Sequence, residues 1–134
     1  MTDVPDAGAR QYTIAVVDDD PSLGRALTRL LSVFGYAVEL FASSSEFLRV
    51  AARSQADCLV VDIDLGDGSG LDMVRRLSSS GFRIPIIFMS GSQDDSVLVQ
   101  CRELGCIAFL RKPFAHSLLM DAIAKAIGQN AAVD

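Results

Sequence analysis

Two hydrophobic patterns alternate along the chain. Five short runs rich in β-branched and other apolar residues are typical of buried strands, and the stretches between them repeat apolar residues every three or four positions, as amphipathic helices do. The predicted strands span residues 12–17, 36–41, 59–62, 84–89 and 106–110. The predicted helices follow them directly and fill most of the remaining chain.

Several of these helices carry start and stop signals. Pro21 fits the first position of the first helix, which makes Asp20 its predicted N-cap. Ser43 followed by Glu46 matches a capping box at the start of a second helix that extends to about residue 53. Glycines, which favour helix ends, stand where the first, fourth and fifth helices are predicted to stop, at Gly35, Gly105 and Gly128.

The alternation of five strands with five helices predicts the fold class. Parallel neighbours need crossover connections, and here the crossovers are helices, so we expect a doubly wound α/β fold with a parallel sheet covered on both faces. In a flavodoxin-like (βα)5 arrangement with strand order 2-1-3-4-5, the topological switch point lies between the first and third strands. Ligands of such sheets bind at the carboxyl edge near that point.

Length and composition indicate one domain. The chain has 134 residues, of which 50% are hydrophobic, enough for a single core. Residues 1–11 are polar and lack the apolar segment of a secretory signal, so we expect a flexible tail there, a domain over 12–128 and a second tail over 129–134. No apolar run approaches the 18 or so residues of a membrane span.

The net charge limits the classes of binding partner, and the cysteine content indicates the redox state of the thiols. A net charge of −5 argues against direct binding to nucleic acid or to an anionic membrane, which would require a basic face. The three cysteines show no zinc-ligand spacing and are typical of reduced thiols in a cytoplasmic protein.

The candidate chemistry lies at the ends of the predicted strands. Asp18 and Asp19 follow the first strand, Asp62 ends the third, Ser90 follows the fourth and Lys112 follows the fifth. Three carboxylates brought together repel one another and would raise the proton affinity of at least one of them unless a cation lies among them, and oxygen ligands beside a phosphate favour Mg²⁺. A carboxylate nucleophile can form an acyl phosphate, while a lysine and a hydroxyl stabilise the phosphoryl oxygens. We interpret Asp62 as this nucleophile.

With these residues the chain resembles the receiver domain of bacterial two-component response regulators, from about residue 13 to residue 127. The resemblance implies that Asp62 accepts a phosphoryl group from a histidine kinase or a histidine phosphotransfer protein. The domain would then be a signalling switch, with no catalysis beyond self-phosphorylation from small phosphodonors and autodephosphorylation. The matched motifs are Val16-Val17-Asp18-Asp19, Asp62 with Gly70, Ser90-Gly91 and Lys112-Pro113.

The resemblance also implies a metal site. Mg²⁺ or Mn²⁺ would be bound directly by Asp19 and Asp62, through water by Asp18, and by the main-chain carbonyl of Asp64. Ser90 would bind the phosphoryl group and Lys112 would pair with it.

Switching is a further implication of the resemblance. Phe109 matches the switch aromatic that turns inward when Ser90 moves, and the Lys112–Pro113 peptide bond is expected to be cis. The output face would combine the fourth helix, the fifth strand and the last helix. The chain ends soon after that helix without a DNA-binding domain, so we expect an unknown downstream protein or a relay role; a truncated transcription factor and a phosphorylation-dependent homodimer remain alternatives.

The loop after Asp62 departs from the family pattern. Gly66 stands where the family often has proline, which predicts a looser loop, and Asp67 is expected to be an ordinary loop residue. Asp64 is acidic where many relatives carry an uncharged side chain. We hypothesise that its carboxylate alters the lifetime of the acyl phosphate, by orienting water or by repelling it.

Three other functions were weighed. Asp62 and Asp64 also resemble the nucleophile motif of haloacid-dehalogenase-like phosphatases, but those enzymes place the nucleophile on the first strand and their paired acids last. An EF-hand calcium loop fails at Gly66 and Asp67, and at Met73, where a glutamate belongs. In a flavin-binding flavodoxin the first loop wraps a phosphate, which the acids of residues 18–20 would repel.

Overall fold

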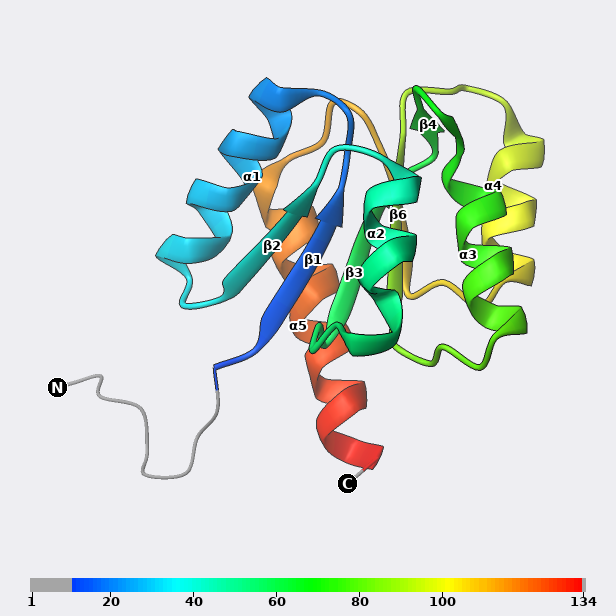
Figure 1. Cartoon of the computed structure of the whole chain (residues 1–134). Coiled ribbons are helices and arrows are strands. Elements are labelled where there is room, and N and C mark those ends of the chain that lie inside the picture. The colour runs from blue at the N-terminus through cyan, green and yellow to red at the C-terminus, as the bar shows by residue number, and fades with distance from the viewer. Residues whose placement is uncertain (1–10, 134) are drawn as a thin grey trace, which may run out of the picture.

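A five-stranded parallel sheet forms the centre of the computed structural model, which describes residues 11–133 (Figure 1). Its order is β2-β1-β3-β6-β7, and every neighbouring pair is parallel. Counted along the chain these strands are 2-1-3-4-5, so the predicted fold class is confirmed. The strands are β1 (Thr13–Val17), β2 (Ala37–Phe41), β3 (Cys58–Asp62), β6 (Ile86–Ser90) and β7 (Ala108–Arg111).

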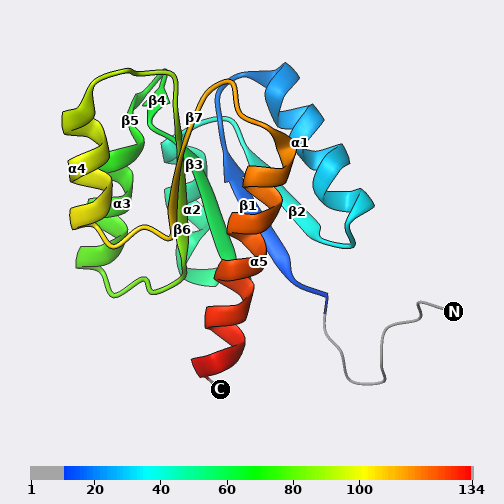
Figure 2. The same cartoon turned by 180° about the vertical axis from the view of Figure 1, so that it is seen from behind.

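Helices cover both faces of the sheet (Figures 1 and 2). Two helices, α1 (Pro21–Val33) and α5 (His116–Val133), pack on one face. The other face is covered by α2 (Ser44–Val50), α3 (Gly70–Ser79) and α4 (Asp95–Glu103). A hydrophobic core lies on each face of the sheet, and because side chains alternate along a strand, the central strands contribute side chains to both cores.

The strand β3 shows this alternation. Leu59 and Val61 belong to the core under α2, α3 and α4, whereas Cys58 and Val60 belong to the core under α1 and α5. All four side chains are fully buried, and β3 has a strand on either side. Burial on both faces explains why the sequence of β3 is a continuous apolar run rather than an alternating one.

The helix signals are reproduced with two differences. The Asp20 side chain caps α1 by accepting from the N–H groups of residues 22 and 23, at 3.0 and 3.4 Å. The Ser43 hydroxyl accepts from the Glu46 N–H at 3.1 Å, as a capping box requires. The Glu46 carboxylate, however, accepts from Ala42 at 3.2 Å instead of from Ser43. The second helix also ends earlier than predicted, at Val50, and continues as a 3-10 turn, η1 (Ala51–Arg53).

The region after Asp62 contains a small hairpin that the sequence did not predict. β4 (Asp64–Leu65) pairs antiparallel with β5 (Gly68–Ser69). Two-residue strands carry no hydrophobic alternation, so no sequence pattern marks them. The hairpin closes the loop between β3 and α3.

Two element boundaries differ from the prediction. β6 begins at Ile86 rather than at residue 84, because Pro85 has no N–H for the ladder. α5 continues through Gly128 to Val133, past its predicted end. A glycine lowers helix stability by about 1 kcal/mol relative to alanine without preventing the helix.

The predicted first tail falls largely on residues 1–10, which lie outside the described residues. Between residues 11 and 133, no helix has the length and apolar character that crossing a membrane requires.

Phe47 offers a test of the core between α2 and the sheet. Its side chain is fully buried, with its ring edge-on to Phe41 at 5.1 Å and to Phe82 at 5.9 Å between centroids. We expect Phe47→Ala to lower the free energy of unfolding by about 3–5 kcal/mol, through lost burial and the cavity left behind. Urea denaturation followed by circular dichroism measures this change.

The matched control is Phe34→Ala, which removes the same group from a side chain that is 59% exposed. We expect it to change the free energy of unfolding by about 1 kcal/mol at most. Equal losses in the two variants would contradict the position of the core.

Candidate functional site

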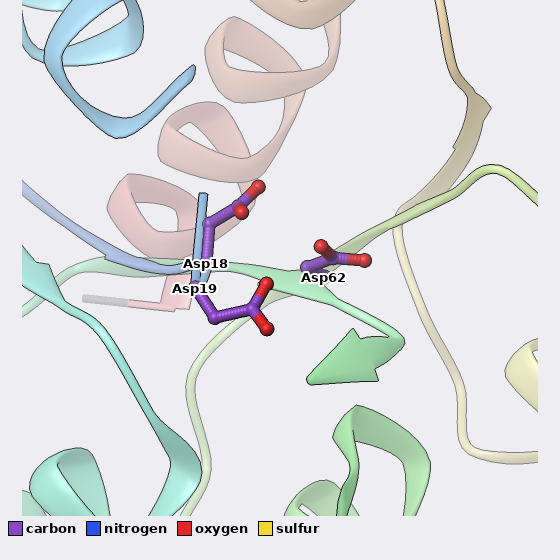
Figure 3. A group of neighbouring side chains, drawn as sticks. All are labelled: Asp18, Asp19 and Asp62. Carbon is purple, nitrogen blue, oxygen red and sulfur yellow. The ribbon is translucent and has the colours of Figure 1, made fainter. Parts of the chain in front are cut away.

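Three carboxylates meet at the carboxyl edge of the sheet. Asp18 and Asp19 follow β1, and Asp62 is the last residue of β3; oxygen atoms of all three lie within 4.8 Å of one another (Figure 3). Asp18 and Asp62 are buried, at 2% and 3% exposure, whereas Asp19 is exposed to solvent. The cluster therefore opens to solvent on the side of Asp19.

The register of β1 and β3 explains why Asp18 and Asp62 lie close together. Val17 is paired with Val61, so the residues that follow, Asp18 and Asp62, leave neighbouring strands at the same level. This is the switch point of the sheet, since β1 connects onward through α1 to β2 while β3 leads to β6 on the opposite side.

Lys112 joins the buried carboxylates. Its Nζ donates to Asp62 Oδ2 at 2.8 Å and to Asp18 Oδ2 at 3.3 Å. Burial disfavours the charged ammonium, but the hydrogen bond to Asp62 and the charges of both carboxylates outweigh it and raise the pKa of Lys112. The lysine is held in its cationic form.

The charged form of Asp62, unlike that of Lys112, is disfavoured by its surroundings. Burial raises the pKa of its carboxyl group, and the charge of Asp18 acts in the same direction. The hydrogen bonds from Lys112 and from the Asp64 N–H, the latter at 3.0 Å, only partly oppose this shift. The charged carboxylate of Asp62 is thus poorly solvated, and a further cation nearby would stabilise it.

The oxygen atoms of the cluster suit a small divalent cation. Three carboxylates supply the hard oxygen ligands that Mg²⁺ and Mn²⁺ prefer. Gly66 also lies against the cluster, since a Cβ there would stand 3.1 Å from Asp19 Oδ2. The residues present therefore fit the predicted metal.

Ser90 ends the adjacent strand β6 and is fully buried. Its hydroxyl accepts from the Ser92 N–H at 3.0 Å, and its carbonyl accepts from the Lys112 N–H at 2.8 Å. The second contact fixes the main chain of Lys112 beside β6. The Lys112–Pro113 peptide bond is cis.

Phe109 lies on β7, partly buried against the core under α2, α3 and α4. The guanidinium of Arg111 lies 5.5 Å from the centre of its ring. Arg111 also donates to the Ser92 carbonyl at 2.7 Å and to the Asp95 carboxylate at 3.1 Å. Sequence reasoning missed Arg111, because a single arginine at a strand end is ordinary without its contacts.

Gly70 is required by close packing beneath the site. A Cβ at this position would clash with the main-chain carbonyl of Asp62 and would lie 2.7 Å from Cγ1 of Val61. Its N–H donates to the Ile63 carbonyl at 2.8 Å. Gly70 thus allows α3 to start directly against the end of β3.

Asp67 has more contacts than the sequence indicated. Its carboxylate accepts hydrogen bonds from Ser44 and Ser45 at the start of α2, more than twenty residues earlier in the chain. An aspartate in a glycine-rich loop is typical of a turn, and no spacing rule connects it to a distant helix. No signal in the sequence could have identified this contact.

The EF-hand alternative is wrong. Asp62 ends a strand of the central sheet, and Met73 is a buried core residue of α3 rather than a loop position. An EF-hand loop connects two helices.

Comparison with known proteins identifies the family. Residues 14–124 match the response regulator receiver domain family. TodT of Pseudomonas putida, a response regulator protein, is 39% identical over 118 residues, which cover 88% of this chain and 52% of TodT. The transcriptional regulatory protein FixJ of Rhizobium meliloti is 31% identical over 115 residues, covering 86% of this chain and 56% of FixJ.

Solved structures of receiver domains are similar in fold to this chain. The structure named FixJ-N has a TM-score of 0.82 at 30% identity, and covers 90% of this chain and 96% of its own. A receiver domain from Clostridium thermocellum has a TM-score of 0.85 at 26% identity, with 92% and 99% covered. The chain spans about half the length of the curated relatives it matches. The family match, together with the order in which the acids occur, rules against a haloacid-dehalogenase-like phosphatase: this chain belongs to the response regulator receiver domain family.

Proposed function

We propose that the chain is a phosphorylation-dependent signalling switch that accepts a phosphoryl group on Asp62. The donor is a histidine kinase or a histidine phosphotransfer protein. The observation that carries the proposal is the environment of Asp62: a buried carboxylate at a strand end, 2.8 Å from the Lys112 ammonium and within 4.8 Å of two more acids.

The transfer requires one bond to form as another breaks. A carboxylate oxygen of Asp62 bonds to phosphorus while the bond from phosphorus to the donor's imidazole nitrogen breaks and leaves its electron pair on that nitrogen. Asp19 and Asp62 would hold Mg²⁺ directly and Asp18 would hold it through water, and the bound cation would supply positive charge beside the phosphoryl oxygens. The Asp64 main-chain carbonyl is the further ligand in this proposal. Lys112 already pairs with Asp62 and is placed to follow the added charge.

Switching follows from that charge. Phosphorylation adds roughly −1.5 to −2 at Asp62. The Ser90 hydroxyl, which now accepts from Ser92, turns to donate to a phosphoryl oxygen and draws its loop with it. Phe109 then moves into the space vacated by the loop.

The output face is formed by α4, β7 and α5. A coupling of about 1–3 kcal/mol between phosphorylation and this face is enough to change the population of the active state by roughly 5- to 150-fold. A downstream protein that reads the face is the proposed effector, and a second phosphorylated copy is the alternative occupant.

Phosphorylation of Asp62 can be tested directly. The protein is incubated with acetyl phosphate and Mg²⁺, and its intact mass is measured. We expect one addition of about 80 Da, because an acyl phosphate replaces the carboxylate.

Asp62→Asn is the matched variant and should remain unmodified, since an amide cannot form the acyl phosphate. Removal of Mg²⁺ with a chelator should abolish the addition in the wild-type protein. An unchanged wild-type mass, or an equal addition in Asp62→Asn, would contradict the proposal.

The Asp64 carboxylate can be tested through the lifetime of the phosphoprotein. Asp64 is exposed beside Asp62, so its charge lies near the path of the water that hydrolyses the acyl phosphate. We expect Asp64→Asn to change the rate of dephosphorylation by more than about twofold, the size of a modest change in local electrostatics.

A slower rate would indicate that the carboxylate orients water, and a faster rate that it repels water. Asp72→Asn, which alters an exposed acid of α3, is the control and should leave the rate unchanged. A dephosphorylation rate of Asp64→Asn within twofold of the wild-type rate would contradict this hypothesis.

A further inference from the structure

The turn between β4 and β5 is tied to α2 by a single side chain. Both carboxylate oxygens of Asp67 are hydrogen-bonded: Oδ1 accepts from the Ser44 N–H at 3.2 Å and Oδ2 from the Ser45 N–H at 3.1 Å. The Ser44 hydroxyl lies 3.0 Å from each oxygen. These donors, with the Ser45 N–H contributing most, lower the pKa of Asp67 although its side chain is exposed.

The same turn touches the acid cluster. Asp64 pairs with Ser69 and Leu65 pairs with Gly68, which places Gly66 and Asp67 at the tip of the hairpin. At its base the Asp64 N–H donates to Asp62. At its tip Gly66 lies against Asp19, where a Cβ would stand 3.1 Å from the carboxylate. One short segment therefore lies between the cluster and the first turn of α2.

This segment is flexible by composition. Gly66 and Gly68 flank Asp67, and Gly68 has a φ of +145°, which side-chain-bearing residues rarely adopt. Glycine loses more conformational freedom on ordering than any other residue. Mg²⁺ requires near-ideal octahedral ligand positions, so a mobile hairpin would bind it weakly.

We propose that Asp67 is a positioning residue for the metal site: its hydrogen bonds to Ser44 and Ser45 hold the β4–β5 hairpin where Asp64 contacts Asp62 and Gly66 lies against Asp19. The proposal rests on the proposed function, because it concerns the Mg²⁺ site of that function. It explains how a loop with three glycines between residues 66 and 70 keeps one geometry.

Capping of α2 alone does not account for these contacts. α2 already has an N-cap, since the Ser43 hydroxyl accepts from the Glu46 N–H at 3.1 Å. Asp67 uses two other N–H groups of the same helix start. Removing Ser43 or Asp67 therefore weakens the same end of α2, but only the loss of Asp67 frees the hairpin.

The test measures Mg²⁺ binding by isothermal titration calorimetry in the unphosphorylated protein, with melting temperatures measured in parallel. The variants are Asp67→Ala, Asp67→Asn and Ser43→Ala. We expect Asp67→Ala to raise the Kd for Mg²⁺ about fivefold, somewhat less than the roughly 10- to 100-fold found when a direct partner of a metal ligand is lost.

Asp67→Asn removes the same charge and keeps one oxygen that can accept from Ser44, but its NH2 group cannot accept from the Ser45 N–H, so its Kd should lie between those of Asp67→Ala and the wild-type protein. Ser43→Ala should lower the melting temperature and leave the Kd within about twofold, because the cap acts on α2 alone. Because both Asp67 variants remove the charge, the difference between their Kd values reports the hydrogen bond that Asn can still accept from Ser44.

Three results would overturn the inference. They are an unchanged Kd in Asp67→Ala, equal weakening in Asp67→Ala and Asp67→Asn, and equal weakening in Asp67→Ala and Ser43→Ala. Absence of Mg²⁺ binding by the wild-type protein would instead overturn the metal site of the proposed function, and this inference with it. The two failures are thus distinguishable.

Discussion

The ion pair between Lys112 and the buried carboxylates is the interaction on which the rest of the site depends. Asp18 and Asp62 are almost fully buried at adjacent strand ends, where their two negative charges repel each other. The Lys112 ammonium contacts both. Main-chain N–H groups satisfy a further oxygen of each acid, from Asp20 to Asp18 at 2.8 Å and from Asp64 to Asp62 at 3.0 Å.

The Lys112 ammonium and the main-chain N–H groups compensate the buried charge of Asp62 only in part. The pKa of Asp62 remains raised, so its anion is less stable than that of a solvated aspartate. Asp19 adds a third carboxylate on the open side of the cluster. A site with three acids and one lysine favours a divalent cation, and the cation in turn favours phosphate. The parallel sheet makes this possible because it delivers residues far apart in the sequence to one edge.

The sequence predicted the fold and the chemical groups of the site well, because both follow from short-range patterns. An apolar run that stops at a carboxylate marks a strand end, and parallel topology brings such ends together. Asp18, Asp62 and Lys112 were found in this way. The geometry now supports their grouping, while their roles in phosphoryl transfer remain predictions.

What the sequence missed are contacts between side chains and distant main-chain groups. The bonds of Asp67 to α2 join segments more than twenty residues apart, and the Arg111 contact with Ser92 spans 19 residues. Neither follows a helical or strand period, so neither could be predicted from spacing. Gly66 predicts a looser loop, and the structure adds two sets of contacts there that the sequence did not indicate, the β4–β5 pairing and the hydrogen bonds of Asp67. The prediction for this loop rested on Gly66 alone, whereas its geometry depends on contacts of the neighbouring residues.

Arg111 indicates how the site is connected to the output face. Its guanidinium bonds to the Ser92 carbonyl, two residues after Ser90, and to Asp95 in the first turn of α4, while lying beside the Phe109 ring. In the proposed switch Ser90 moves toward the phosphoryl group, and Ser92 moves with it because the two are bonded. In that proposal Arg111 would have to break these contacts or move with Ser92, which would connect Ser90, Phe109 and the start of α4 through one side chain. A contiguous set of contacts can carry coupling of this kind if it has a second arrangement, whereas proximity alone cannot.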